Sequence, residues 1–303
     1  MKKTAMLFLA MATALSLASA APEADRNSVS RHFDFQNFTI LSVSHSFRVD
    51  LTFADTFSVD VEVPDFIEPY LRVSQVGEKV VISLENLPWE VQRKLNDNPG
   101  KLQAKVSMKQ LRQLQMSGAT KLVASNQLNC GTDELRIELS GASELEALSV
   151  RGEGRLLIDL SGASEADVDS RMKDVKADLS GASKLTWKGD VRTLDIDCSG
   201  ASKVQFDGNV EDKLTAEVSG SSKLNMGKNI RTMKLEVSGA SKFELSGQVE
   251  EANVELTGAS KALIPVTRKM LYDISGVSTL RVKDLGATIR GDISRGSKLE
   301  YVK

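Results

Sequence analysis

Two columns of charged side chains recur at a fixed spacing in the second half of the chain, and they have the clearest potential for chemistry. The first is a column of carboxylates that includes Asp178, Asp197, Glu217, Glu236 and Glu255. The second is a column of amines, Lys184, Lys203, Lys223, Lys242 and Lys261. Stacked carboxylates offer the oxygen ligands that Ca²⁺ prefers, and a row of ammonium groups attracts an anionic glycan or protein.

Both columns also have a plain interpretation as solvated strand faces. Unit charges about 4.8 Å apart in water repel by only about 0.9 kcal/mol before salt screening. A Ca²⁺-binding solenoid usually carries its acids and glycines together in the turns, whereas here the acids precede the turn within the strand. We therefore predict no metal and no cofactor, and keep the metal ladder as the alternative for the carboxylates.

The columns are positioned by a four-residue phrase, Ser-Gly-Ala-Ser, that recurs ten times in recognisable form. The copies begin at Ser117, Ser140, Ser161, Ser180, Ser199, Ser219, Ser238, Thr257, Ser275 and Ser294. A carboxylate stands two residues before the copy in nine of the ten, and a lysine stands four residues after its start in five consecutive copies. A period near 19 residues predicts a stack of repeats.

The residues around each phrase alternate between apolar and polar. Apolar side chains lie one, three and five positions before it, and again five and seven positions after its first residue. This period of two predicts strands with one buried face, joined by a tight corner at the phrase. The fold class is therefore all-β: a parallel β-helix, or β-solenoid, of about ten 19-residue coils with an N-terminal β cap region. Parallel crossovers favour the right hand.

Three segments divide the chain. Residues 1–20 carry Lys2 and Lys3, an apolar run and a final Ala-Ser-Ala, which predicts a signal peptide cleaved after Ala20. Residues 21–105 form an N-terminal β region that caps and continues the solenoid, and residues 106–303 form the repeat solenoid. The mature chain has no transmembrane segment, and we expect it in the periplasm or at the cell surface.

The net charge, the two cysteines and two irregular segments lead to further expectations. The formal net charge of −2 gives no reason to expect nucleic acid as a partner. Cys130 and Cys198 lie three coils apart, too far for a disulfide, so we expect two free thiols. The stretch from Leu87 to Gly100 is expected to be a loop or a short helix, and the charged last strand, with Lys298, is expected to protect an open edge.

The Val80-Val81-Ile82-Ser83-Leu84 strand and the serial Leu-Ser-Gly-Ala-Ser-Lys-Leu coils resemble the putative auto-transporter adhesin, head GIN domain family. The resemblance runs from about Phe33 to the C-terminus. It implies a secreted or cell-envelope protein of bacteria such as the Bacteroidetes, with a β-helical fold and no established activity. It supplies no catalytic residues to transfer to this chain.

These observations predict a non-catalytic exported envelope protein, an adhesin or binding module that presents charged stripes to a glycan or to an envelope or host surface protein. We expect a monomer or a weak oligomer. The alternative is a structural or filament-forming envelope β-helix. A polysaccharide-active enzyme is disfavoured because Trp187, Tyr272 and Tyr301 are the solenoid's only Trp or Tyr residues, and because His32 and His45 lie in the cap region outside any catalytic motif.

Overall fold

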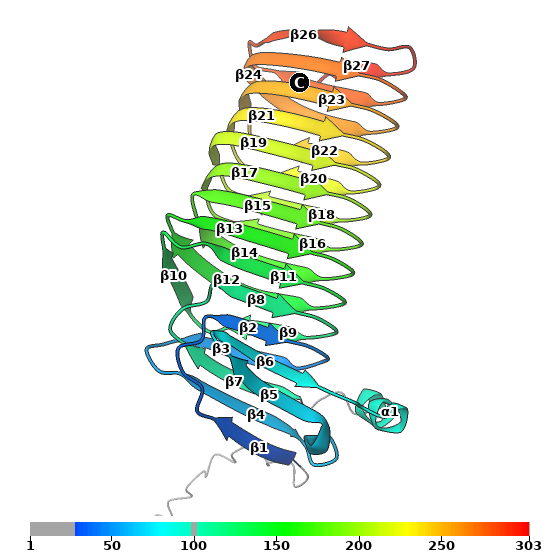
Figure 1. Ribbon diagram of the computed structural model, residues 1–303. Coiled ribbons are helices and arrows are strands. Elements are labelled where there is room, and N and C mark those ends of the chain that lie inside the picture. Colours follow the sequence, from blue (N-terminus) through cyan, green and yellow to red (C-terminus); the bar gives the residue numbers. More distant parts are fainter. Residues whose placement is uncertain (1–27, 98–101, 303) are drawn as a thin grey trace, which may run out of the picture.

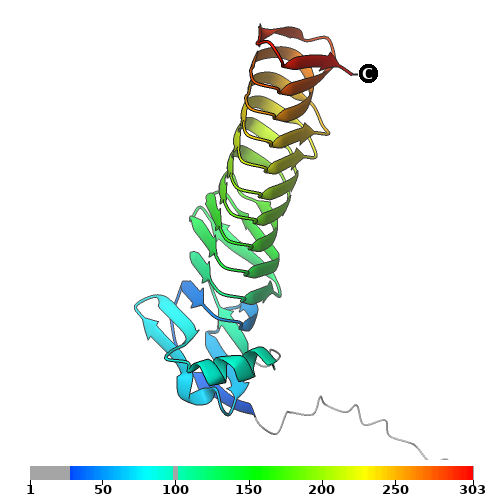
Figure 2. The ribbon, with the colours of Figure 1, turned by 90° about the vertical axis from the view of Figure 1, so that its right-hand side faces the viewer.

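The computed structural model describes residues 28–97 and 102–302, so the predicted signal peptide lies outside the described residues. These residues form a 27-stranded sheet system wound into a tall solenoid, with the strands of the first part of the chain at its foot (Figures 1 and 2). The predicted all-β solenoid is confirmed. The two helices of the described part have three and nine residues, too few to span a bilayer, which needs about 20.

The foot of the solenoid holds the elements before the first full repeat. They are β1 (Ser28–Phe33), β2 (Ile40–Val43), β3 (Arg48–Phe53), β4 (Ser58–Pro64), η1 (Glu68–Tyr70), β5 (Leu71–Val76), β6 (Lys79–Leu84), α1 (Trp89–Asp97) and β7 (Gln103–Met108). Of the two expectations for Leu87 to Gly100, the short helix is therefore correct.

Above the foot, each coil contributes one strand before its corner and one strand after it. The strands before the corner are β8 (Gln113–Met116), β11 (Leu135–Leu139), β13 (Arg155–Leu160), β15 (Asp174–Leu179), β17 (Val191–Cys198), β19 (Val210–Val218), β21 (Ile230–Val237), β23 (Val249–Leu256) and β26 (Thr288–Ile293). The strands after it are β9 (Lys121–Ala124), β12 (Glu144–Gly152), β14 (Glu165–Arg171), β16 (Lys184–Lys188), β18 (Lys203–Asp207), β20 (Lys223–Met226), β22 (Lys242–Leu245), β25 (Thr279–Asp284) and β27 (Lys298–Tyr301). In addition, β10 (Gln127–Gly131) pairs with β12, and the long β24 (Lys261–Ile274) serves both faces.

Successive coils pair in parallel, with each inward residue directly above its counterpart. Leu156 on β13 pairs with Val175 on β15, and Val175 pairs with Leu194 on β17. All three side chains are buried, as the alternation predicts. The largest buried side chain, Trp187, stacks on Phe206 of the next coil with ring centroids 5.6 Å apart. The core is thus a continuous apolar column.

The corner phrase has a steric cause. Gly200 has a φ of 71°, and a Cβ there would lie 2.5 Å from the carbonyl oxygen of Gly181 in the coil below. Only glycine fits both the backbone angle and this close approach. In nine of the ten copies the last residue of the phrase is a buried serine or threonine. In the first five copies its hydroxyl donates within the corner, for example from Ser202 Oγ to the Ser199 carbonyl at 2.7 Å.

The foot joins the solenoid through parallel pairing. Strand β2 pairs in parallel with β8, and β3 with β9. Beyond them β4 pairs antiparallel with β7, β1 with β4, and β5 with β6. The corner between β2 and β3 is an unrecognised copy of the phrase, in which His45 takes the place of glycine with a φ of 74°.

Both cysteines are buried as free thiols. Burial raises the pKa of Cys130 to about 11 and that of Cys198 to about 12. Such thiols are inert packing groups at neutral pH, because the thiolate is the reactive form.

Candidate binding groove

The carboxylates of the acidic column are direct neighbours across the parallel sheet. The pairing runs in register from Asp159 to Asp178, Asp197, Glu217, Glu236, Glu255, Asp273 and Asp292. The lysine column is equally regular, from Lys184 to Lys203, Lys223, Lys242 and Lys261. The structure therefore brings every predicted candidate residue into one of two stacked columns, on the strands either side of the corner.

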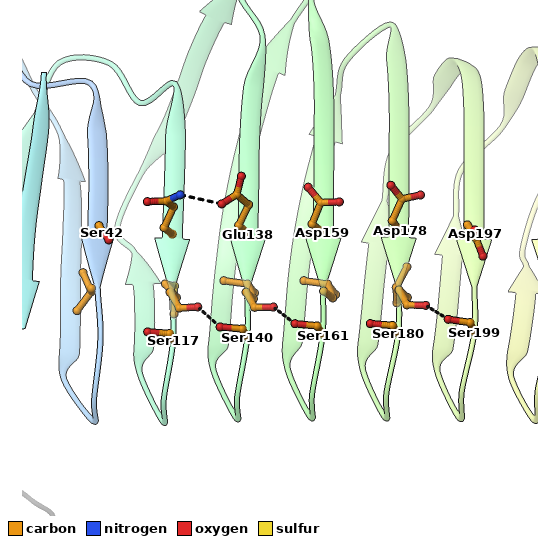
Figure 3. Close-up of a pocket in the computed structure, with 16 residues that line it drawn as sticks. Ser42, Ser117, Glu138, Ser140, Asp159, Ser161, Asp178, Ser180, Asp197 and Ser199 are labelled. Atoms are coloured by element: carbon orange, nitrogen blue, oxygen red, sulfur yellow. Dashed lines mark hydrogen bonds between the residues drawn. The ribbon is translucent and has the colours of Figure 1, made fainter.

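The acidic column lines a concave surface. Its carboxylates and the first serines of the phrase form the walls of a groove of about 610 Å³, lined by Glu138, Asp159, Asp178, Asp197, Ser117, Ser140, Ser161, Ser180 and Ser199 among others. A second hollow of about 300 Å³ continues it from Asp197 and Ser199 to Glu255 and Thr257. Figure 3 shows the carboxylates and the serines of the first segment as two parallel rows. We call the two segments together the acid–serine groove.

Four serines of the row, Ser140, Ser161, Ser199 and Ser219, donate hydrogen bonds to carbonyls of the coil below. Ser140 Oγ donates to the Met116 carbonyl at 3.3 Å, and Ser199 Oγ donates to the Leu179 carbonyl at 3.3 Å. A hydroxyl that donates in this way keeps its oxygen lone pairs free to accept. Each coil from Glu138 to Glu255 thus offers the groove one carboxylate and one hydroxyl oxygen as acceptors.

The carboxylates of the groove are partly desolvated and crowd one another. Burial, and then the charge of Asp178, raises the pKa of both Asp159 and Asp197. Some of the charge is balanced on the same strands: Lys176 Nζ lies 3.1 Å from an Asp178 carboxylate oxygen, and Arg136 lies 3.5 Å from Asp159. A bound cationic or hydroxyl group would relieve the remaining repulsion.

The lysine column is a solvated row, with four of its five side chains exposed and Lys223 half-buried. Lys184 pairs with Glu165 at 3.0 Å and Lys242 with Glu244 at 2.8 Å. Within residues 28–97 and 102–302, Lys203, Lys223 and Lys261 have no ion pair. None of the five amines lines the acid–serine groove.

The described residues contain no cluster of three or more His, Cys, Asp or Glu side chains that could hold a metal ion. The absence of such a cluster follows from the register, because each coil contributes one carboxylate to one side of the groove. The carboxylate oxygens are therefore spread along the solenoid axis. His32 is exposed between Asp60, at 2.7 Å, and Asp34, at 2.9 Å, and these hydrogen bonds raise its pKa. Burial lowers the pKa of His45, whose Nδ1 accepts a hydrogen bond from the Leu84 backbone at 3.3 Å.

Sequence reasoning missed the concavity and the role of the first serines. It placed the acids on an open strand face and treated the serines as small corner residues. The signal was present in the regular hydroxyl at the start of each phrase, three positions from a buried serine. The groove also extends below the first acid, where Gln115 donates to Glu138 at 2.8 Å and Ser42 forms part of the wall.

A continuous β-solenoid with an open polar groove defines a class of elongated repeat proteins that offer long surfaces for contact. Within this class the chain belongs to the family described as "putative auto-transporter adhesin, head GIN domain", which matches residues 37–229 and 196–303.

Solved structures of similar proteins come from bacteria of the genus Parabacteroides. A "putative adhesin" from Parabacteroides merdae is 14% identical with a TM-score of 0.43, and the match covers 92% of this chain and 98% of that one. A "putative lipid binding protein" from Parabacteroides distasonis is 14% identical with a TM-score of 0.47, over 92% and 98% of the two chains. A "putative adhesin" from the same species is 13% identical with a TM-score of 0.42, over 91% and 97%. No curated protein matches the chain.

Proposed function

We propose that this protein is a non-catalytic binding module of the cell envelope, and that the acid–serine groove holds an extended glycan. The single observation that supports the proposal most is the repetition of one acceptor pair, a carboxylate and a hydroxyl, along a continuous concavity. A polymer can repeat the same contact from coil to coil, so weak contacts add up within one molecule. Membership of the adhesin-type family is consistent with this role.

The chemistry of the groove selects the kind of glycan. Carboxylates accept hydrogen bonds from sugar hydroxyls, and they accept stronger, charge-assisted ones from an ammonium group. An amino-sugar polymer therefore fits the groove better than a sulfated or uronic acid polymer, which its carboxylates repel. The lysine column, across the corner, is the proposed second surface, where an anionic substituent or an acidic patch of a surface protein would bind.

The proposed function depends on export of the protein and on the three segments predicted from its sequence. Residues 1–20 direct export and are removed, residues 21–105 cap and continue the solenoid, and residues 106–303 carry both charged columns. The mature protein then acts in the periplasm or at the cell surface, where envelope and host glycans are accessible. It turns over no substrate.

Binding of the mature protein to immobilised glucosamine polymer, neutral glucan and heparin tests the proposal, in Ca²⁺ and in EDTA. The groove variant Asp159→Asn/Asp178→Asn/Asp197→Asn keeps the shape of each side chain and removes the charge. The column variant Lys203→Glu/Lys223→Glu/Lys242→Glu reverses the other surface. A control with the same charge change, Glu90→Gln/Asp167→Asn/Glu211→Gln, alters three exposed side chains that have no hydrogen bond or ion pair within the described residues.

We expect the glucosamine polymer to bind independently of Ca²⁺, with affinity reduced at least about tenfold in the groove variant and unchanged in the control. Equal binding by the groove variant and the control would contradict the groove as the site. Release of new reducing ends from any polymer would contradict the non-catalytic assignment.

A further inference from the structure

Within the part of the chain that the structure describes, the last coil of the solenoid leaves two core positions exposed. Ile293 and Tyr301 stand in inward columns whose members one coil below, Ile274 and Val282, are fully buried. In the last coil the same positions are 43% and 62% exposed. Figures 1 and 2 show the last coil, β26 and β27, with no described element above it. Exposed core side chains at the end of a solenoid require a capping element that shields them from water.

The backbone of the last coil is also unpaired on its upper edge. In the described residues β26 pairs only with β24, and β27 only with β25. Ser294 and Lys298 donate their N–H groups down to the coil below, to Ile274 and Ser278. Because these groups alternate along a strand, the odd-numbered residues, 289 to 293 on β26 and 299 and 301 on β27, direct theirs upward.

We propose that the cover is a second copy of this chain, joined end to end about a two-fold axis. A two-fold axis across the rod pairs each edge strand with its own copy in antiparallel fashion. Such a pairing must match odd residues with odd residues, since these carry the free backbone groups. The pairing must also keep inward side chains facing inward. Because the inward residues of both strands are odd-numbered as well, pairing odd residues with odd residues meets this requirement.

The charges on β26 select one register. Centred on Gly291, the pairing sets Ile289 opposite the partner's Ile293, and it sets Arg290 opposite the partner's Asp292. Moving the centre of the pairing by one residue, to 290 or to 292, places Arg290 opposite the partner's Arg290 or Asp292 opposite the partner's Asp292. Like charges in direct opposition destabilise a strand pair.

Strand β27 repeats the pattern independently. Centred on Leu299, its pairing sets Lys298 opposite the partner's Glu300, and a one-residue shift opposes Lys298 or Glu300 to its own copy. A single axis requires the two centres to lie at similar distances from the corner, and Gly291 lies three residues before its first serine while Leu299 lies two residues after its last. Arg290, Asp292 and Lys298 have no ion pair within the described part of the chain, while Glu300 lies 3.6 Å from Arg281.

This surface differs from the acid–serine groove and does not depend on the proposed function. An isologous contact uses up the open end, so assembly stops at two copies unless the foot provides a second interface. The last strands, predicted to protect an edge with their charges, instead carry charges that complement their own reversed copy. Assembly as a dimer thus replaces the filament alternative.

Light scattering coupled to size-exclusion chromatography tests the dimer on the mature full-length chain. We expect the wild type to convert from monomer to dimer as its concentration rises to about 0.1 mM, a range that detects a weak specific contact. Arg290→Asp places two aspartates in opposition at two symmetric positions, so it should weaken dimerisation at least about tenfold. The swap Arg290→Asp/Asp292→Arg restores opposite charges and should restore the dimer.

Circular dichroism and the thermal midpoint of the monomer check that both exposed substitutions leave the fold intact. A wild type that stays monomeric at about 0.1 mM would overturn the proposal. So would a dimer that Arg290→Asp leaves unchanged, or a swap that fails to restore what the single substitution removed. Growth beyond two copies would overturn the closed two-fold arrangement.

Discussion

The glycine ladder of the corners allows a quantitative test of why the phrase recurs. Gly200 and Gly131 are both exposed and have similar backbone angles, with φ of 71° and 60°. They differ in their surroundings: a Cβ at Gly200 would lie 2.5 Å from the Gly181 oxygen, whereas a Cβ at Gly131 would meet nothing within 4 Å. Alanine at the two positions therefore separates the backbone strain from the contact between coils.

The expected magnitudes follow from these two terms. A left-handed conformation costs a non-glycine residue about 1–2 kcal/mol, which both variants lose. Forcing two packed coils apart adds about 1–3 kcal/mol, which only Gly200→Ala loses. We expect Gly131→Ala to lower the free energy of unfolding by about 1–2 kcal/mol, and Gly200→Ala to lower it by about 2–5 kcal/mol.

Urea denaturation followed by far-ultraviolet circular dichroism measures both values, provided that the slope with urea is unchanged between variants. Equal losses for the two variants would refute the idea that coil-to-coil approach requires glycine. In that case the recurrence of the phrase would reflect the turn conformation alone.

Three further predictions follow from the core, the corner and the groove. Trp187→Ala removes the largest buried side chain and should lower the free energy of unfolding by about 3–5 kcal/mol, measured by urea denaturation. Ser183→Ala leaves the Ser180 carbonyl without its 2.6 Å hydrogen bond and should cost about 1–3 kcal/mol in the same assay; no loss would mean that the corner carbonyl needs no donor. Burial and the charge of Asp178 raise the pKa of Asp197 above its ordinary 3.8, so the folded state binds this proton more tightly than the unfolded state. The stability gained from protonating Asp197 is complete below pH 3.8 and is lost as the pH rises through the folded-state pKa. Asp197→Asn should therefore raise the thermal midpoint at pH 7 but not at pH 3. An equal rise at both pH values would contradict the upward direction of the pKa shift.

The fold could be predicted from sequence because the repeat exposes its own geometry. Once the copies are aligned, the alternation around them assigns inward residues such as Trp187 and Cys198, and these are fully buried. The first corner escaped recognition because His45 stands where the other corners have glycine. Its positive φ accompanies a hydrogen bond from the Leu84 backbone, 39 residues away, which no local pattern displays.

The site could be predicted only in part. Register follows from the period, so the sequence correctly aligned Asp178 above Asp159 and Lys203 above Lys184. Concavity depends on how the strand meets the corner, and on which backbone groups the serines engage, such as the bond from Ser140 to Met116. These are three-dimensional properties, and for that reason the sequence alone could not show that the acidic column lines a groove.

The most direct test of the binding proposal is the protection of groove carboxylates by a bound glycan. Carbodiimide coupling to carboxylates, mapped by mass spectrometry, should modify Asp178 and Asp197 in the free protein, because both line the open groove. With glucosamine polymer bound, labelling at these positions should fall several-fold, while labelling at the exposed Asp167, which does not line the groove, stays constant. A polymer that binds without changing the labelling of Asp178 and Asp197 would contradict the account.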